Sequence, residues 1–331
     1  MTRGTRYFMI GSVATLLVGL GAGLVAYYSG FPLGALSRAG APEELRYLPK
    51  EATVVAYANV HDVMNSQLRQ RLRSIEPEEQ RDGQKAFQAK TGINLETDVD
   101  RVVACLTRKP VAAERGQGLV LARGRFDEVR LEGLAREHGG SVEDYKGKRL
   151  LTHRGDLDSG GEMAMAFLEA GLVALGSDQL VRGAIDLAAG GESVRANSDL
   201  MRLVGDMGAS NAWAVGRFDT LADTARLPQG VASQTPSITW LAAEGHVNGG
   251  VSGVVKAEAR DEAAAQNLRD VVRGFMALAK LQTGSKPELQ TILQSFELGG
   301  TGSTVSLTFA IPAETFEAMT PKSPNAGGRR R

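Results

Sequence analysis

The chain has 331 residues, of which 43% are hydrophobic, and this load is normal for a globular protein of one or two domains. The formal net charge is zero, yet all 38 acidic residues lie between Glu43 and Glu317, while seven of the 38 basic residues lie outside that stretch. The central stretch is therefore acidic and repels phosphate backbones, which argues against nucleic-acid binding.

The N-terminal segment has the character of a membrane span. No charged residue occurs from Tyr7 to Ser37, and Arg3 and Arg6 precede this run. About 20 apolar residues in a helix cross the hydrocarbon core of a bilayer, and the positive-inside bias places the two arginines in the cytoplasm. We therefore predict a cytoplasmic tail over 1–6, a transmembrane anchor over 7–30 and a linker over 31–50. The body then lies in the periplasm, or otherwise outside the cytoplasm, attached to the inner membrane.

A cleaved signal peptide is the alternative interpretation of this segment. The apolar region of a signal peptide usually has about 7–15 residues, and the run here is longer. The A-x-A match at Ala39-Gly40-Ala41 is followed by Pro42, which is unfavourable just after a cleavage site. Both interpretations export the body.

The first half of the body, over 51–208, combines strand and helix patterns. Alternating or apolar runs predict strands, and Gly92, Gly139 and Gly190 mark helix ends. The predicted strands are 53–58, 102–106, 118–124, 163–168 and 172–175, with a hairpin turn at 145–148, and the predicted helices are 60–75, 80–90, 127–138 and one from Asp178 to about 189.

The second half, over 209–319, repeats this order. Asn248-Gly249 between two apolar runs is a strong hairpin signal. The predicted strands are 212–215, 237–246, 251–258 and 303–310, and the predicted helices are 220–225, 261–281, one from Pro287 and 313–319; the basic tail over 320–331 is predicted to be disordered.

Short matches connect the two halves. Ala56-Tyr57-Ala58 resembles Ala212-Trp213-Ala214, and Asp127-Glu128 matches Asp261-Glu262 at the start of a helix. We therefore predict an α+β protein, with an N-terminal transmembrane helix followed by two ferredoxin-like (β-α-β-β-α-β) halves with mostly antiparallel sheets. A true duplication of the two halves is left open. The long helix over 261–281 is expected to pack Phe275 against the sheet that contains the Asn248-Gly249 hairpin.

The opening of the body, Tyr47-Leu48-Pro49 followed by the strand Thr53–Ala58, and the turn over Gly92–Val99 together resemble an uncharacterised class of bacterial membrane-anchored extracytoplasmic proteins. The resemblance implies export and membrane attachment. It carries no known active site, and it therefore transfers no functional residue.

Candidate chemistry is sparse. The four histidines show no metal-ligand spacing, Cys105 is alone in an apolar strand, and Asp156–Glu162 lacks the ligand positions of a calcium loop. Asp98, Asp100 and Arg101 are interpreted as a solvated turn with a local ion pair, and Arg154-Gly-Asp156 as a chance tripeptide. We therefore assign no catalytic, cofactor-binding or metal residue and no cofactor.

The leading functional hypothesis is a non-enzymatic binding or assembly module held at the membrane by its N-terminal helix. Its partner would be another protein, recruited through an exposed strand edge. An exported hydrolase with a site assembled from scattered residues is the alternative. The oligomeric state is not determined by the sequence.

Overall fold

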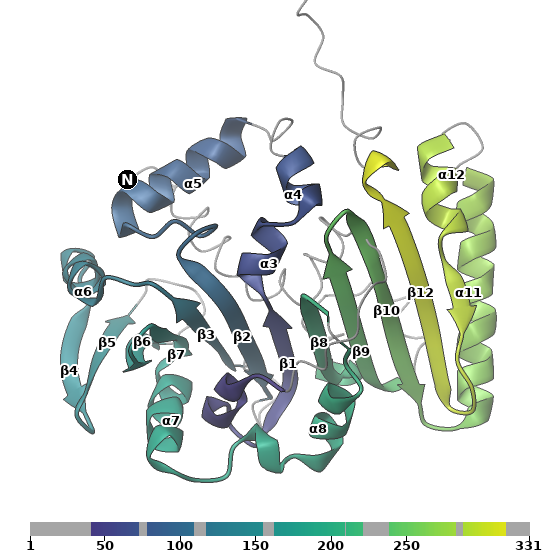
Figure 1. Ribbon diagram of the computed structural model, residues 1–331. Coiled ribbons are helices and arrows are strands. Elements are labelled where there is room, and N and C mark those ends of the chain that lie inside the picture. The colour runs from purple at the N-terminus through teal and green to yellow at the C-terminus, as the bar shows by residue number, and fades with distance from the viewer. Residues whose placement is uncertain are drawn as a thin grey trace, which may run out of the picture.

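One antiparallel sheet of 12 strands runs through both halves of the protein (Figure 1). The computed structural model describes residues 41–72, 78–108, 117–154, 162–208, 210–220, 238–282 and 287–315. The strand order is β11-β12-β10-β9-β8-β1-β2-β3-β7-β6-β5-β4. In chain order the strands are β1 (Ala52–Ala58), β2 (Val99–Thr107), β3 (Gln117–Gly124), β4 (Ser141–Tyr145), β5 (Lys148–Arg154), β6 (Glu162–Glu169), β7 (Leu172–Ser177), β8 (Ala212–Arg217), β9 (Ile238–Val247), β10 (Gly250–Ala259), β11 (Glu297–Gly299) and β12 (Thr304–Pro312).

Helices cover both faces of this sheet. They are η2 (Glu43–Tyr47), α3 (Val60–Met64), α4 (Gln67–Leu72), α5 (Glu78–Thr91), α6 (Glu128–Glu137), α7 (Asp178–Ala189), η4 (Val194–Ala196), α8 (Ser198–Gly205), α11 (Glu262–Gln282) and α12 (Pro287–Gln294). The largest core cluster lies where η2, α7 and α8 pack on the central strands, and it includes Leu45, Val55, Leu121, Val181 and Leu200. Smaller clusters lie under α3, under α4 and α12, and under α11.

The two halves meet at the centre of the sheet, where β1 and β8 pair antiparallel. The pairing sets Ala56 opposite Ala214, Tyr57 opposite Trp213 and Ala58 opposite Ala212. The rings of Tyr57 and Trp213 stack with their centroids 5.7 Å apart. The two short matching sequences therefore face each other across a local two-fold arrangement, and their aromatic pair stabilises the junction.

The order of strands repeats outward from this junction. One half runs β1-β2-β3-β7-β6 and the other runs β8-β9-β10-β12-β11, with the β4–β5 hairpin added to the first half. Asp127 before α6 and Asp261 before α11 occupy equivalent places. Each carboxylate accepts a backbone N–H of the first helical turn, from Arg130 and Ala264 respectively.

The α+β class and the antiparallel sheet are confirmed, but the ferredoxin-like pairing is wrong. In a ferredoxin-like unit, the strands joined by a helical crossover lie parallel with another strand between them. Here β1 and β2 are direct antiparallel neighbours. The reason is visible in Figure 1, where α3, α4 and α5 stay at the end of the sheet at which β1 finishes, so the chain re-enters beside β1 from that same end.

Several local predictions also need correction. The helix predicted over 60–75 is broken into α3 and α4, because the Ser66 hydroxyl donates to the Val63 carbonyl and accepts the Arg69 N–H. The short helix α8 and the strand β11 were not predicted. Residues 43–48, assigned to the linker, belong to the fold, with Leu45 and Leu48 fully buried.

The two edges of the sheet disfavour the addition of a partner strand. The strand β4 has five residues and carries Glu143 and Asp144, and β11 has three residues. Short, charged edge strands are a known protection against edge-to-edge pairing. The proposed recruitment through a strand edge therefore finds no support at these two strands.

The long helix was predicted in the right place but with the wrong exposure. It packs on the sheet through Ala264, Ala265 and Leu268 in its first turns. Farther along, Phe275 is 56% exposed, Leu278 57% and Leu281 80%. Figure 1 shows α12 beside the second half of α11, where it contacts both α11 and β12, so α12 covers the sheet at this end and Phe275, Leu278 and Leu281 remain exposed. The expected burial of Phe275 is wrong.

Some predictions fall outside the described residues. These are the transmembrane anchor over 7–30, the Arg154-Gly-Asp156 motif beyond the backbone of residue 154, the Asp156–Glu162 motif apart from Glu162, most of the helix over 220–225, the end of the helix over 313–319 and the basic tail. Among the helices that the structure does describe, none combines the length and the apolar character needed to cross a bilayer.

A pair of truncations tests the exposure of the two apolar sites. Leu68 is 1% exposed and packs with Val251 and Phe309, so Leu68→Ala should lower the free energy of unfolding by roughly 2–5 kcal/mol. Because Phe275 projects into solvent, Phe275→Ala should change it by no more than about 0.5 kcal/mol. Urea unfolding of both variants measures the difference, and a large loss for Phe275→Ala would contradict the placement of α11.

Candidate functional site

The most elaborate polar arrangement surrounds η2, the first element of the body. Its apolar residues Leu45 and Tyr47, and Leu48 directly after it, are buried in the main core cluster. On the same short helix, Glu44 is only 1% exposed. A carboxylate buried this deeply needs charged partners. Moving an isolated ionised carboxylate from water into the protein interior costs roughly several kcal/mol of free energy.

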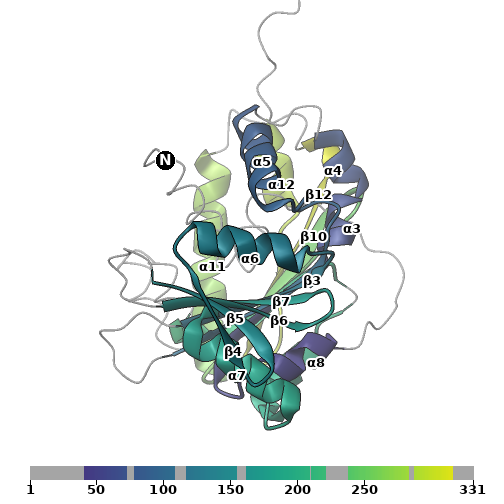
Figure 2. The ribbon, with the colours of Figure 1, turned by 90° about the vertical axis from the view of Figure 1, so that its left-hand side faces the viewer.

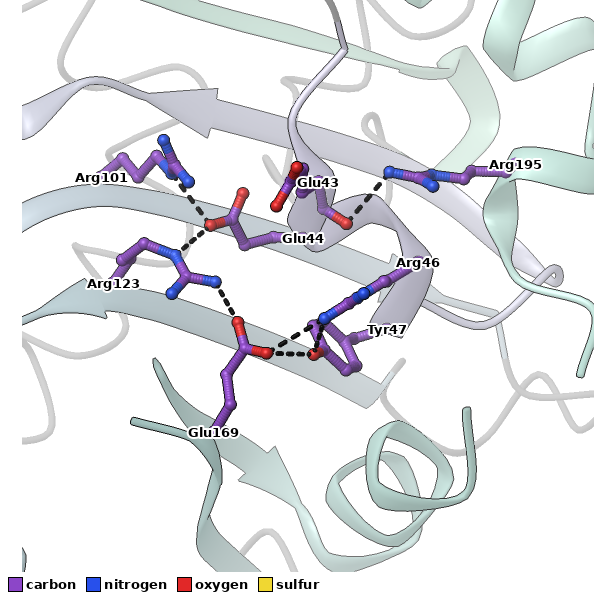
Figure 3. Close-up of polar contacts among 8 residues, drawn as sticks. All are labelled: Glu43, Glu44, Arg46, Tyr47, Arg101, Arg123, Glu169 and Arg195. Atoms are coloured by element: carbon purple, nitrogen blue, oxygen red, sulfur yellow. Dashed lines mark hydrogen bonds and ion pairs between the residues drawn. The ribbon is translucent and has the colours of Figure 1, made fainter. Parts of the chain in front are cut away.

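Two arginines supply those partners. The Nε atoms of Arg101 on β2 and Arg123 on β3 both donate to Oε1 of Glu44, at 2.9 and 2.6 Å (Figure 3). The strand register sets these two arginines directly opposite each other. Like charges in directly opposed positions destabilise a sheet, and the shared carboxylate removes this repulsion.

A second carboxylate extends the network. Glu169 Oε1 accepts from Nη2 of Arg123 at 2.5 Å, and its Oε2 accepts from the Tyr47 hydroxyl and from Nη2 of Arg46, each at 3.0 Å. The Arg46 guanidinium also lies over the Tyr47 ring, 4.6 Å from its centroid. We call Glu44, Arg46, Tyr47, Arg101, Arg123 and Glu169 the η2 clamp. Figure 3 shows that it joins η2 to β2, β3 and the end of β6.

Local backbone features bring Glu169 into this position. The pairing of β6 with β7 shifts register between Phe167 and Glu169, which is a β-bulge. The turn after it contains Gly171 with φ +71°, and a Cβ there would lie 2.7 Å from the Gly124 carbonyl oxygen. Glycine is therefore required for the turn to approach the end of β3, and this approach brings Glu169 beside Arg123.

The η2 clamp lowers the pKa values of both carboxyl groups, Glu44 and Glu169. Burial raises the pKa of Glu44, but hydrogen bonds from Arg123, its own backbone amide and Arg101 outweigh burial, so the pKa lies below its usual value. For Glu169 the hydrogen bond from Arg123 is the main cause of a lowered pKa, opposed by burial and assisted by Tyr47. Both groups therefore favour the ionised form, and the clamp is an ionic assembly. The second oxygen of Glu44, Oε2, is buried without a hydrogen-bond partner in the described part of the chain.

The other side of Glu169 borders a cavity of about 290 Å³, which we call the α6 cavity. It lies between α6, the β4–β5 hairpin and the β6–β7 turn. Its lining residues are Glu128, Glu132, Gly147, Lys148, Arg149, Leu151, Phe167, Glu169 and Ala170. Glu169 thus belongs both to the clamp and to the cavity.

The residues considered from the sequence lie elsewhere. Cys105 is buried, as predicted, and burial raises its pKa to about 12, which keeps the thiol protonated and unreactive. His61 on α3 and His138, the residue that follows α6, are both exposed. Within the described ranges, no group of three or more His, Cys, Asp or Glu side chains is arranged to hold a metal.

The interpretation of Asp98, Asp100 and Arg101 as one local ion pair is wrong. Asp98 pairs with Arg125 at 3.3 Å, whereas Arg101 reaches Glu44, 57 residues away in sequence. The sequence does contain a signal for the contact between Arg101 and Glu44. Side chains alternate between the two faces of a strand, so Arg101 lies on the same face as Val103 and Cys105. An inward-facing arginine needs a buried acid, and Glu44 beside Leu45 was a candidate.

Comparisons with known proteins give little further guidance. No protein-family model matches the chain, and no curated protein matches it. Among solved structures it is similar to crystal form I of TP0453, with 9% sequence identity and a TM-score of 0.48, over 86% of this chain and 98% of that one.

Removal of the central carboxylate should destabilise the body. Glu44→Ala leaves Arg101 and Arg123 facing each other with no shared anion, and we expect a loss of about 2–3 kcal/mol in the free energy of unfolding, moderated by the partial exposure of both arginines. Glu43→Ala is the matched control, because Glu43 is exposed and its hydrogen bond from Arg195 goes to the backbone carbonyl, which the substitution keeps. Urea unfolding of the full chain in detergent micelles should show a loss only for Glu44→Ala, and equal losses would contradict the clamp.

The clamp should also make stability depend on pH. Because the pKa of Glu44 is lower in the folded state, the unfolded chain binds a proton at higher pH than the folded chain does. The stabilisation that ionised Glu44 provides is therefore complete above about pH 4.3, the pKa of a glutamate in the unfolded chain. It is lost as the pH falls through the pKa of Glu44 in the folded state. Glu44→Gln should flatten this part of the profile of unfolding free energy against pH, whereas an unchanged slope would show that Glu44 does not contribute to it.

Proposed function

We propose that the protein is a single-pass inner-membrane protein whose body lies outside the cytoplasm and acts as a non-enzymatic binding or assembly module. The observation that carries this proposal is the uncharged run from Tyr7 to Ser37 behind Arg3 and Arg6. A run of that length is sufficient for a membrane helix, and the basic residues before it favour a cytoplasmic N-terminus.

The position of η2 supports a body held close to the membrane. Only 11 residues separate Gly30, where the proposed anchor ends, from Pro42, the residue before η2. A chain of that length reaches at most about 40 Å when fully extended. Because the η2 clamp fixes η2 to the sheet, the linker from the membrane would end on a firmly held part of the body.

Two surface features support the binding part of the proposal. The α6 cavity is lined by charged residues together with the apolar side chains of Leu151 and Phe167, so it offers both polar and apolar contacts to a ligand. The second half of α11 presents Phe275, Leu278 and Leu281 to solvent at spacings of three residues, and hence on one face. Contiguous exposed apolar residues are more common on proteins that contact other molecules.

A protease-protection experiment tests the topology. With a tag at each end, protease added to intact spheroplasts should digest the body and the C-terminal tag and leave the N-terminal tag protected, because only residues before the span lie inside. Loss of the N-terminal tag would reverse the orientation. A mature chain that begins near Pro42 would replace the anchor with a cleaved signal peptide.

A charge-reversal variant sharpens this test. Arg3→Glu combined with Arg6→Glu should lower the fraction of molecules with a protected N-terminal tag, since the positive-inside bias is lost. The matched control is Arg329→Glu combined with Arg330→Glu at the far end of the chain, which should leave that fraction unchanged.

A further inference from the structure

The second half of α11 gathers exposed apolar side chains on one side. Four large hydrophobic side chains stand out as exposed in the described part of the chain, and three of them, Phe275, Leu278 and Leu281, lie within about two turns of this helix. Phe275 and Leu281 each lie three residues from Leu278, so the three share one face, which we call the α11 face. Figures 1 and 2 show α11 at the outer side of the second half of the body, where another molecule can reach it.

This part of α11 is apolar on every side. No polar side chain occurs from Gly274 to Ala279. Met276 and Ala279 are partly buried against the body, where α11 contacts α12 and the sheet. A helix that is apolar all round is normally covered all round. The body covers one side of this stretch, so the α11 face is suited to a second cover.

Gly274 indicates that this cover is another helix. A Cβ at Gly274 would meet no atom within 4 Å, and its φ is not positive, so the fold does not require glycine at this position. Glycine nevertheless weakens the interior of a helix relative to alanine. Small residues on a helix face allow the backbone of a second helix to approach closely, whereas a lipid surface gains nothing from a missing side chain.

The charges beside the α11 face favour an antiparallel copy of the same helix. Asp270, Arg273 and Lys280 are exposed, and Arg273 pairs with Asp270 at 2.7 Å. Two parallel copies would set each of these groups beside its own like charge, which is unfavourable. An antiparallel two-fold centred on Leu278 instead separates the two copies of Arg273 by about 15 Å along the helix axis. It also sets Phe275 opposite Leu281 of the second copy.

We propose that the α11 face binds a second copy of this chain, in an antiparallel two-fold pairing centred on Leu278. The face is smaller than the roughly 800 Å² per partner of a typical stable interface, so the pairing is weak between free molecules. Attachment to one membrane raises the effective concentration of the copies, and a two-fold axis along the membrane normal keeps both anchors in that membrane. The proposal rests on the proposed function in this respect, and it names the partner of the assembly module.

Cysteine cross-linking of the full chain in its native membrane tests the pairing. Cys105 is buried, so the natural chain should give no disulfide-linked dimer. Leu278→Cys places a thiol at the two-fold axis, and oxidation with copper phenanthroline in air should join two copies. Val129→Cys is the matched control, because Val129 is also exposed, at 82%, but lies on α6. It should give no dimer.

Mixed copies determine the direction of the helices. When Phe275→Cys and Leu281→Cys chains with different tags share one membrane, the mixed disulfide should form more readily than either chain forms with itself. Parallel helices would give the opposite preference and would overturn the antiparallel assignment.

A glycine substitution tests the close approach. Gly274→Leu in the Leu278→Cys chain should lower the yield of cross-linked dimer about tenfold, because the added side chain keeps the two helices apart. Gly133→Leu is the matched control, since Gly133 is also exposed inside a helix and a Cβ there would meet no atom within 4 Å. Equal yields for the two variants would contradict close helix packing.

The proposal is rejected if Leu278→Cys gives no more dimer than Val129→Cys. Protection of the unlinked Leu278→Cys thiol from a water-soluble maleimide would then assign the α11 face to lipid or to another protein, and free reaction would show that nothing covers it. The protease-protection experiment does not depend on the pairing, so the expected topology without cross-linking would reject the pairing alone. Reversed topology with cross-linking would reject the proposed function and leave the pairing in place, because both copies would still share one membrane.

Discussion

The conflict between Arg101 and Arg123 is the constraint on which the first half of the body depends. The antiparallel register places these two cations opposite each other on neighbouring strands, on the face that also carries Val103 and Leu121. Their repulsion in a partly buried place would weaken β2 and β3 unless an anion lay between them. Glu44 is that anion, and it comes from outside the sheet, on η2.

This dependence makes η2 part of the body and not an appendage. The helix contributes Leu45 and Tyr47 to the main core cluster as well as the carboxylate of Glu44. A buried ion pair by itself adds little stability, because desolvation offsets the attraction, but it fixes the geometry of the groups that share it. The clamp therefore sets where the chain enters the fold, and the apolar residues beside it provide the stabilisation.

The elements with strong local signals could be predicted from the sequence. Asp127 and Asp261 each cap a helix as their position indicated, and the Asn248-Gly249 turn lies between β9 and β10. Local hydrogen bonding determines such features, so neighbouring residues are sufficient to reveal them. The antiparallel class of the sheet followed from the same hairpins.

Features that depend on distant partners could not be predicted in the same way. The pairing of β1 with β8 joins segments more than 150 residues apart, and only the similarity of Tyr57 and Trp213 pointed to it. The exposure of Phe275 depends on α12, which covers the sheet beside the second half of α11, and the amphipathic pattern of α11 alone does not reveal this packing. The sequence favours a local pair for Arg101 because Glu44 lies in residues 31–50, which the sequence predicts to be a linker.

The shared residue Glu169 gives the clamp and the α6 cavity a common boundary. Its two oxygens are held by Arg123 on one side and by Arg46 and Tyr47 on the other, so the side chain cannot turn farther into the cavity without giving up these bonds. The turn after it is also tied to the end of β3, because the Gly124 N–H donates to the Gly171 carbonyl at 2.8 Å. One end of the cavity is therefore rigid, and it is rigid for the same reason that η2 is fixed on the sheet. The cavity and the point where the chain enters the body consequently have a fixed relation to each other, set by a single carboxylate.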